Sequence, residues 1–220
     1  MIIVLSQRVT KESRYRETRD ALSHDWCKFI EDRGGVPVPI PNALNDVSNY
    51  VDRLRPKYVI LTGGNTVAEA DGEAEDCSRE RDETERHLLS YAIKNYIPVL
   101  GVCRGMQMIQ AYFGGVLSRI DGVQNHVASR HEVSLSEDMA VRSGQETGIV
   151  NSYHEWGIRQ HQVAEQLIPF ARCSIDNTIE GFAHTSYPII GVMWHPEREG
   201  SDNRVNHALL NYFFGLSKEG

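Results

Sequence analysis

The strongest constraint on the fold is a set of short apolar runs that alternate with segments of helical pattern. The runs are Ile2–Leu5, Tyr58–Leu61, Pro98–Val102 and Ile189–Trp194. Each has the length of one strand, and a run that is apolar at almost every position indicates a strand buried on both faces. Buried strands joined by helices form a parallel sheet between two helical layers. The sequence therefore predicts an α/β fold with a mainly parallel central sheet and helices on both faces.

Helical patterns and weaker strand patterns fill the rest of the chain. Helices are expected at residues 21–32, 104–113 and 206–216, and a strongly charged helix at residues 78–95. Extended segments are expected at residues 36–40 and near 131–135, 170–175 and 179–184. The chain contains no repeat, low-complexity tract or linker, so we expect a single domain over residues 1–220.

Composition excludes several functional classes. The chain has 220 residues with 40% hydrophobic and 24% charged residues, which is typical of a globular protein. Its formal net charge of −7 argues against a nucleic-acid partner. No apolar run is long enough to span a membrane, and Met1–Leu5 has the pattern of a first strand rather than a signal peptide. We therefore expect a cytoplasmic protein.

Cysteine and histidine spacing predicts neither disulfides nor a metal site. The four cysteines are scattered without a CxxC pair, which favours free thiols. Nine histidines are present, but no HExxH segment occurs. We therefore expect no cofactor and no bound metal.

A nucleophile motif lies between the third apolar run and the helix that follows it. Residues Gly101–Gly105 have the form glycine-x-cysteine-x-glycine, which is typical of a tight strand-to-helix turn that exposes its central side chain. The partial positive charge at a helix N-terminus favours the thiolate form of Cys103. A buried structural cysteine is the alternative, but the flanking glycines favour a nucleophile.

Two further loops follow apolar runs and supply the remaining catalytic groups. In extended chain, residues i and i+2 point the same way, so Glu197 can orient the imidazole of His195, which would act as general base. The amides of Gly64 and Arg104 are candidates for an oxyanion hole. The alternatives are a surface turn at His195 and an ordinary glycine turn at Gly64.

These three segments, LTGGN, GVCRGMQ and MWHPERE, resemble the class I glutamine amidotransferase family over nearly the whole chain. The resemblance implies a flavodoxin-like sheet and a Cys103-His195-Glu197 triad that cleaves a γ-glutamyl amide through a thioester. It also implies that Gln107 helps to hold the glutamyl group. The segment Asn151–His154 resembles the family's N-S-x-H segment, whose backbone borders the α-carboxylate and α-amino group of the glutamyl substrate. The resemblance therefore implies that Asn151, Ser152 and Tyr153 border the substrate through their backbone. His154 is expected to be a satisfied loop histidine.

The GVCRGMQ form and the opening Ser6–Arg8 segment resemble the stand-alone γ-glutamyl hydrolases of this family. Within that branch, LSQRVTKESRYRETRDALSHDWCKF and NTIEGFAH are most similar to hydrolases of γ-glutamyl-CDP-amidate in capsule phosphoramidate synthesis. Five basic residues follow the first strand, and Arg8 and Arg14 are the leading candidates for binding a diphosphate. The side chain of Arg104 is a further candidate. A solvated loop of mixed charge is the alternative. The basic residues are Arg8, Lys11, Arg14, Arg16 and Arg19.

Other functions stay open at this stage. The sequence does not determine the amine that leaves from the substrate. Hydrolysis of γ-glutamyl-γ-aminobutyrate is therefore one alternative, and a glutaminase subunit that delivers ammonia to a synthase is another. A non-catalytic regulatory protein is the alternative from a different class. We expect a small-molecule γ-glutamyl substrate, with a nucleotide-linked compound as one option, and no nucleic-acid or membrane partner. A homodimer is one option for the assembly, and the sequence does not fix the oligomeric state.

Overall fold

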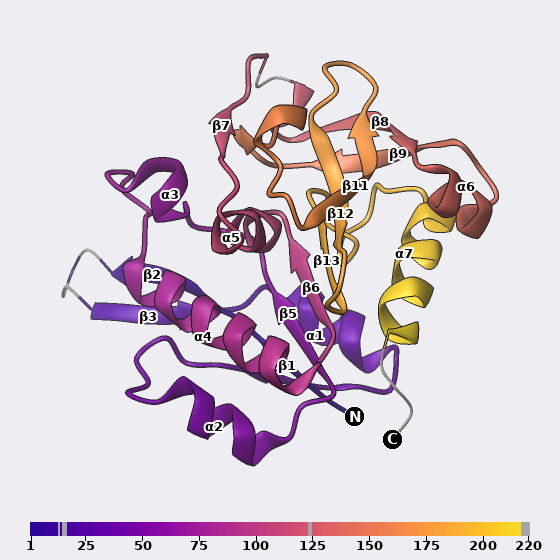
Figure 1. Ribbon diagram of the computed structural model, residues 1–220. Helices are drawn as coiled ribbons and strands as arrows, with labels where there is room; N and C mark the ends of the chain where they lie inside the picture. Colours follow the sequence, from indigo (N-terminus) through magenta and orange to yellow (C-terminus); the bar gives the residue numbers. More distant parts are fainter. Residues whose placement is uncertain (13, 15–16, 123–124, 217–220) are drawn as a thin grey trace.

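The computed structural model describes residues 1–12, 14, 17–122 and 125–216, which are built around a nine-stranded sheet (Figure 1). The strand order is β4-β1-β5-β6-β13-β12-β11-β8-β9. In that order the strands are Val36–Pro39, Ile2–Leu5, Tyr58–Leu61, Val99–Val102, Ile189–Val192, Ile179–His184, Leu167–Cys173, Ser129–Leu135 and Thr147–Ser152.

The first five strands of this order are parallel. By chain position their order is 2-1-3-4-5, which is the flavodoxin-like order. Strand β4 contains two prolines, which have no backbone N–H to donate. It lies at the edge of the sheet, where the missing hydrogen bonds destabilise the sheet least. The predicted α/β fold is thus confirmed, with four antiparallel strands added beside β13.

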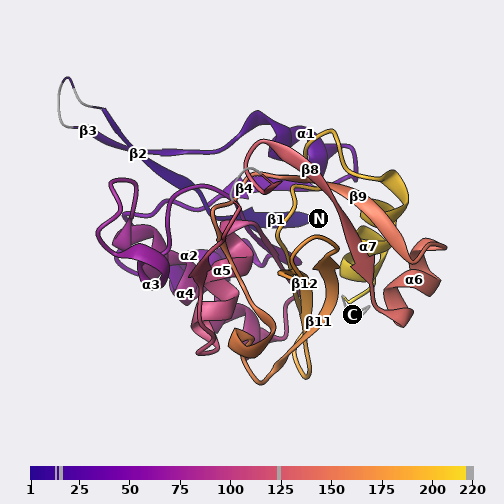
Figure 2. The ribbon, with the colours of Figure 1, turned by 90° about the horizontal axis from the view of Figure 1, so that it is seen from above.

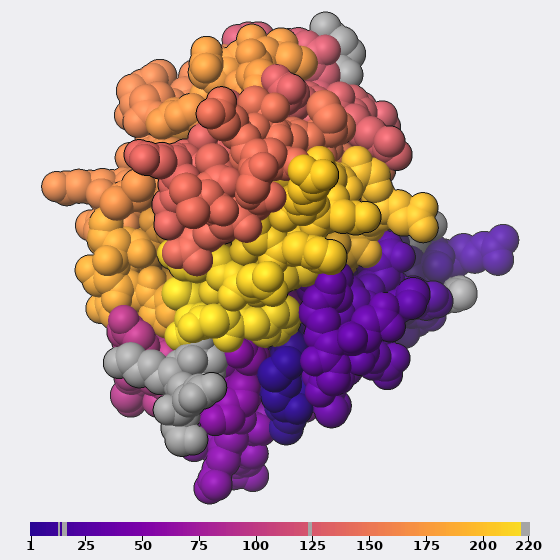
Figure 3. Space-filling model, turned by 90° about the vertical axis from the view of Figure 1, so that its right-hand side faces the viewer, coloured from indigo at the N-terminus to yellow at the C-terminus, as the bar shows by residue number. Residues whose placement is uncertain are grey.

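Helices cover both faces because successive residues of a buried strand point to opposite sides. Leu100 and Val102 of β6 belong to the core under α1 and α7, whereas Val99 belongs to the core under α2, α4 and α5. Figure 3 shows the first of these faces, with yellow α7 between the violet N-terminal segment and the salmon segment that contains β8, α6 and β9. The helices are α1 His24–Glu31, α2 Val47–Leu54, α3 Ala68–Asp71, α4 Arg79–Asn95, α5 Arg104–Tyr112, α6 Glu137–Ser143 and α7 Asn203–Gly215.

Several elements lie outside the sequence predictions. Residues 8–19 were expected to be a loop, but β2 (Arg8–Glu12) and β3 (Glu17–Ala21) pair as a hairpin that projects from the body (Figure 2). Only Val9 of β2 is buried, so the hairpin leaves almost no apolar pattern. The chain also contains helices α2, α3 and α6, strand β9, the small β7–β10 pair and a 3₁₀ turn that the apolar pattern did not predict. The last three short elements are Ser118–Arg119, Trp156–Gly157 and Gln160–Gln162.

Three adjacent parallel strands end at the same edge of the sheet. Leu61 of β5 is in register with Gly101 of β6, and Val102 is in register with Val192 of β13. The three loops singled out in the sequence therefore leave the sheet side by side. No helix within the described parts of the chain is long and apolar enough to cross a membrane.

Candidate active site

Cys103 occupies a strained turn between β6 and α5. Its φ of 53° and ψ of −108° lie outside the regions that residues with a side chain prefer, and its amide donates to the carbonyl of Val192 at 2.8 Å. A Cβ on Gly101 would lie 2.7 Å from the backbone of Gly105, and one on Gly105 would overlap the carbonyl of Leu61. Both glycines therefore allow the turn to pack directly on the neighbouring strand.

His195 lies beside this turn and is held by Glu197. Its Nδ1 is 2.7 Å from Glu197 Oε1, and both side chains are buried. Because the carboxylate accepts, Nδ1 carries the proton and Nε2 is left for the thiol of Cys103. The imidazole and the thiol lie close enough that each shifts the pKa of the other. The structure thus brings together the three residues that were predicted as a triad.

The environment favours a thiolate–imidazolium pair. Burial alone would raise the pKa of Cys103, but the hydrogen bond and charge of His195 lower that pKa below the usual value of a thiol. Burial alone would lower the pKa of His195, but Glu197 and the thiol of Cys103 raise it to about 9. Cys103 therefore has the environment of a reactive cysteine rather than of an inert buried one.

Asn151 fixes the backbone of His195. Its Oδ1 accepts from the His195 amide at 2.8 Å, and its Nδ2 donates to the His195 carbonyl at 3.0 Å. The hydroxyl of Ser152 is also occupied, because it donates to the carbonyl of His126 at 2.7 Å. Both side chains are buried and neither lines the cavity. The sequence prediction concerns the backbone of this segment, and that part stays a prediction. Tyr153, the third residue of the segment, does line the cavity.

The loop after β5 is held from behind by Arg81 of α4, which the sequence analysis did not single out. The Arg81 guanidinium donates to the carbonyls of Thr62 at 2.6 Å and Gly63 at 3.3 Å, and to that of Gly64. Gly64 has a φ of +87°, a conformation that glycine adopts without strain. With its carbonyls fixed on Arg81, this loop is rigid at the edge where an oxyanion hole was predicted.

The side chain of Arg104 does not face the cavity. Its guanidinium is 1% exposed and forms ion pairs with Asp82 and Glu85 of α4. The expectation that this guanidinium contributes to binding a diphosphate is therefore wrong, because it is buried and paired with two carboxylates instead of facing the cavity. The Arg104 amide instead donates to the sulfur of Cys103 and remains a candidate oxyanion donor.

A cavity of about 370 Å³ opens above the Cys103 turn. Gln107 and Tyr153 line it, as predicted, together with His154 and Trp156. Gln107 Nε2 donates to the carbonyl of Trp156 at 2.9 Å, and the ring of Tyr153 meets His195 edge-on with 5.5 Å between centroids. The volume is suited to a small polar group such as a glutamyl moiety.

A second cavity of about 410 Å³ adjoins the first and shares Asn65 and Asp76 with it. Arg8 and Lys11 line this second cavity, and the Arg8 guanidinium lies against Gly64. Arg14, in the loop between β2 and β3, lines neither cavity. Arg19 pairs with Glu17 at 2.8 Å, and Arg16 lies outside the described residues.

We expect Gly63→Ala to slow alkylation of Cys103 by iodoacetamide at neutral pH by about tenfold, which corresponds to one pKa unit. A Cβ on Gly63 would lie 2.8 Å from His195 Cε1, so the imidazole must shift from the position in which it lowers the pKa of the Cys103 thiol. The rate can be measured by mass spectrometry. Gly72→Ala is the control, because its Cβ meets nothing closer than 3.4 Å. An equal rate in Gly63→Ala and the native protein would contradict the prediction.

Comparisons with known proteins agree with this arrangement. The family model for Peptidase C26 matches residues 1–197. The chain is 35% identical to "Gamma-glutamyl-CDP-amidate hydrolase" of Campylobacter jejuni over 100% of both chains. It is 28% identical to "Gamma-glutamyl-gamma-aminobutyrate hydrolase" of Escherichia coli O157:H7, over 87% of this chain and 84% of that protein.

A solved structure supports the fold independently. A glutamine amidotransferase from Thermotoga maritima superposes with a TM-score of 0.63 at 16% identity, over 97% of this chain and 83% of that one. At this identity the match concerns the fold alone. The match to the family model over residues 1–197 and the full-length relative at 35% identity show that the chain belongs to the Peptidase C26 family.

Proposed function

We propose that this protein hydrolyses a γ-glutamyl amide bond, with Cys103 as nucleophile, His195 as acid and base, and Glu197 as the group that orients His195. The observation that carries the proposal is the chain of contacts from thiol to imidazole to carboxylate beside a cavity. Membership of a family that includes γ-glutamyl hydrolases supports the choice of bond.

The proposed reaction has two halves. The Cys103 thiolate attacks the γ-carbonyl carbon, and the amides of Gly64 and Arg104 donate to the resulting oxyanion. The imidazolium of His195 gives its proton to the leaving nitrogen as the carbon–nitrogen bond breaks, which leaves a γ-glutamyl thioester. His195 then takes a proton from water, the hydroxide attacks the thioester, and glutamate and the thiolate are released.

We further propose γ-glutamyl-CDP-amidate as the substrate, with glutamate and cytidine diphosphoramidate as products. The name of the Campylobacter relative supports this choice. So does the adjoining cavity, where Arg8 and Lys11 can attract a diphosphate that leaves the Cys103 cavity. The carboxylate of Asp76 at the shared wall accepts from the Thr66 hydroxyl at 2.7 Å, which offsets part of its repulsion of phosphate.

Arg8→Ala is expected to lower kcat/KM for γ-glutamyl-CDP-amidate by about 10–100-fold, because a hydrogen bond to a charged group contributes about 1.5–3 kcal/mol. Turnover of γ-glutamyl-γ-aminobutyrate and glutamine should change little. Arg14→Ala, at the tip of the hairpin, should have a smaller effect than Arg8→Ala. Arg53→Ala on the exposed side of α2 is the control. Glutamate release from all three substrates measures the result.

The alternative substrate is γ-glutamyl-γ-aminobutyrate, which the name of the Escherichia coli relative supports. If that compound is turned over fastest and Arg8→Ala affects all substrates alike, this alternative replaces the nucleotide substrate. If glutamine is turned over fastest, the glutaminase alternative gains support. In either case the proposed thioester chemistry at Cys103 is unchanged.

The pH dependence of kcat/KM should be bell-shaped, with an alkaline limb near pH 9. His195 must be protonated to donate to the leaving nitrogen, and its pKa is raised to about 9, so activity falls as pH rises through that value. The acidic limb follows protonation of the thiolate, whose pKa is lowered. Glu197→Gln removes the carboxylate that raises the His195 pKa, so the alkaline limb should move to lower pH. An unmoved limb in Glu197→Gln would contradict the role given to Glu197.

We also propose that residues 1–220 act as one domain, since both hydrophobic cores pack on the same sheet. The four cysteines Cys27, Cys77, Cys103 and Cys173 are free thiols, which fits a reducing compartment. On this ground we propose the cytoplasm as the site of action.

A further inference from the structure

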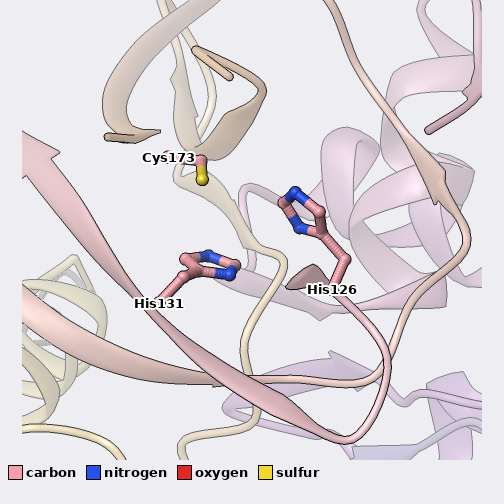
Figure 4. A group of neighbouring side chains, drawn as sticks. All are labelled: His126, His131 and Cys173. Atoms are coloured by element: carbon pink, nitrogen blue, oxygen red, sulfur yellow. The ribbon is translucent and has the colours of Figure 1, made fainter. Parts of the chain in front are cut away.

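A group of buried histidines lies behind the wall of the Cys103 cavity. It consists of His126 before β8, His131 in β8 and His154 after β9, gathered around Glu180 of β12, and we call these four residues the histidine cluster. At most 1% of each of these side chains is exposed. The thiol of Cys173 at the end of β11 points toward the rings of His126 and His131 (Figure 4).

Each histidine uses one ring nitrogen to donate to an acceptor outside the cluster. His154 Nδ1 lies 3.1 Å from the carbonyl of Trp156, and His131 Nδ1 lies 3.2 Å from the carbonyl of Asn125. His126 Nε2 lies 3.1 Å from the carboxylate of Asp176, whose pKa is lowered by hydrogen bonds despite burial. Because these oxygens can only accept, the three nitrogens carry protons.

The remaining nitrogens all face Glu180. His126 Nδ1 and His154 Nε2 lie 3.8 and 3.6 Å from Glu180 Oε1, and His131 Nε2 lies 3.4 Å from Oε2. Within the described part of the chain, none of the three nitrogens has a hydrogen-bond partner, and neither does Glu180 Oε2. Buried polar atoms without a hydrogen-bond partner are rare. The lone pairs of the three ring nitrogens and of the carboxylate converge, and a bound cation would satisfy them together.

The distances are close to those between the ligands of one metal ion. An N–H···O bond is about 2.7–3.2 Å long, so separations of 3.4–3.8 Å are too long for good hydrogen bonds. Around a tetrahedral Zn²⁺ with bonds of about 2.0–2.2 Å, neighbouring ligand atoms lie about 3.3–3.6 Å apart. Donor atoms of His126, His154 and Glu180 all lie within 4.8 Å of one another, as do those of His126, His131 and Cys173.

We propose that the histidine cluster binds a Zn²⁺ ion through His126 Nδ1, His154 Nε2 and Glu180 Oε1, with His131 or Cys173 as the fourth ligand. Imidazole, carboxylate and thiolate are the donors that zinc prefers, and a closed set of protein ligands is typical of a structural site. The outer acceptors already hold each ring in the tautomer that coordination requires. The ligands are scattered over residues 126–180, which is why short sequence motifs predicted no metal.

A proton instead of a metal would satisfy the cluster less well. One added proton can turn His131 into an imidazolium paired with Glu180. The lone pairs of His126 and His154 would still face the same carboxylate oxygen in a buried space. A divalent cation satisfies these groups together, because it accepts electron pairs from both nitrogens and from the carboxylate.

The proposed ion would fasten one wall of the active-site cavity. His154 lines that cavity with Tyr153 and Trp156, and its amide donates to the carbonyl of His126 at 2.9 Å. The ion would tie this wall to β12 through Glu180. We therefore expect zinc to stabilise the fold and the cavity without taking part in bond cleavage.

The test is a metal-binding measurement on the full chain carrying Cys103→Ala, from which any purification tag has been removed. This background prevents zinc from binding to the Cys103–His195 pair. After dialysis against a chelator, we expect the protein to take up about one equivalent of Zn²⁺. Binding should raise the midpoint of thermal unfolding, and Co²⁺ in place of Zn²⁺ should give the visible absorption bands of a tetrahedral site.

Variants then assign the ligands. His154→Gln and Glu180→Gln should abolish stoichiometric uptake, and Asp176→Asn, which changes only the outer partner of His126, should weaken binding by about 10–100-fold. His24→Gln on the exposed first turn of α1 is the matched control and should bind like the parent. Circular dichroism checks that each variant is folded.

The proposal is overturned if the Cys103→Ala protein takes up no Zn²⁺ at micromolar concentrations, or if folded His154→Gln and Glu180→Gln proteins bind it as the parent does. If those two variants do not fold, the stoichiometry and the Co²⁺ spectrum of the parent decide the question alone. Since none of these measurements involves turnover, the result does not depend on the proposed hydrolase function.

Discussion

Cys103→Ala is expected to lower turnover of every γ-glutamyl substrate to the background of the assay, a loss of about 10⁴–10⁶-fold. Losses of this size follow removal of the nucleophile from a catalytic triad, because without it no covalent thioester intermediate can form. His195 and the Arg104 amide also lower the pKa of the Cys103 thiol, which favours its nucleophilic thiolate form. The measurement is glutamate release at saturating substrate with purified protein.

The controls separate loss of chemistry from loss of structure. Cys103→Ser keeps the side-chain size but raises the pKa of the nucleophile, so it should also be inactive. Cys27→Ala removes a different, partly exposed thiol that lines neither cavity and should retain activity. Iodoacetamide should inactivate the native protein and Cys27→Ala alike. Appreciable turnover by a folded Cys103→Ala protein would refute the proposed mechanism, whichever substrate is used.

The parts of the fold that the sequence predicts are those in which burial is uniform along the chain. Strands β1, β5, β6 and β13 are apolar at almost every position because both faces of each are covered, so the pattern is hard to mistake. The turn at Cys103 is predictable for a different reason. Gly101 and Gly105 lie where any side chain would clash, so the turn requires glycine at both positions and the sequence motif shows it.

Other features are invisible in the sequence because they depend on contacts between distant segments. The sequence gives no sign that the Asn151 side chain holds the backbone of His195, which lies 44 positions away. The histidine cluster joins segments that are separate in the chain. Strand β2 buries only Val9, so the hairpin has no apolar alternation to indicate it.

Helix α4 is the clearest case of a misleading pattern. Its sequence is strongly charged and was predicted simply as a charged helix, a pattern typical of a solvated surface. In the structure Arg81 and Glu85 are fully buried and Asp82 is nearly so. They are buried because Arg104 of α5 and the carbonyls of the loop after β5 satisfy them, and neither partner is close in the sequence.

Arg81→Met is therefore expected to lower the free energy of unfolding by about 3–5 kcal/mol, the range for breaking a buried ion pair on one side. Methionine fills a similar volume but donates nothing to Glu85, which lies 3.0 Å from Arg81 Nε, or to the carbonyl of Thr62 at 2.6 Å. Urea denaturation followed by circular dichroism measures the change. Arg86→Met is the matched control on the same helix, because its ion pair with Glu69 is exposed and should contribute less than about 1 kcal/mol.

The same substitution should impair catalysis in the molecules that remain folded. Without Arg81, the carbonyls of Gly63 and Gly64 lose the donor that fixes the loop orientation, so the Gly64 amide is no longer held for the oxyanion. Loss of one oxyanion donor costs about 10²–10³-fold in kcat, and we expect a loss of that order for Arg81→Met at a temperature where it is folded. The Gly64 amide is proposed to donate to the oxyanion, which forms only after the substrate has bound. The substitution should therefore change KM much less than kcat. A destabilised Arg81→Met protein with native kcat would mean that the ion-pair network supports the fold but not the oxyanion loop.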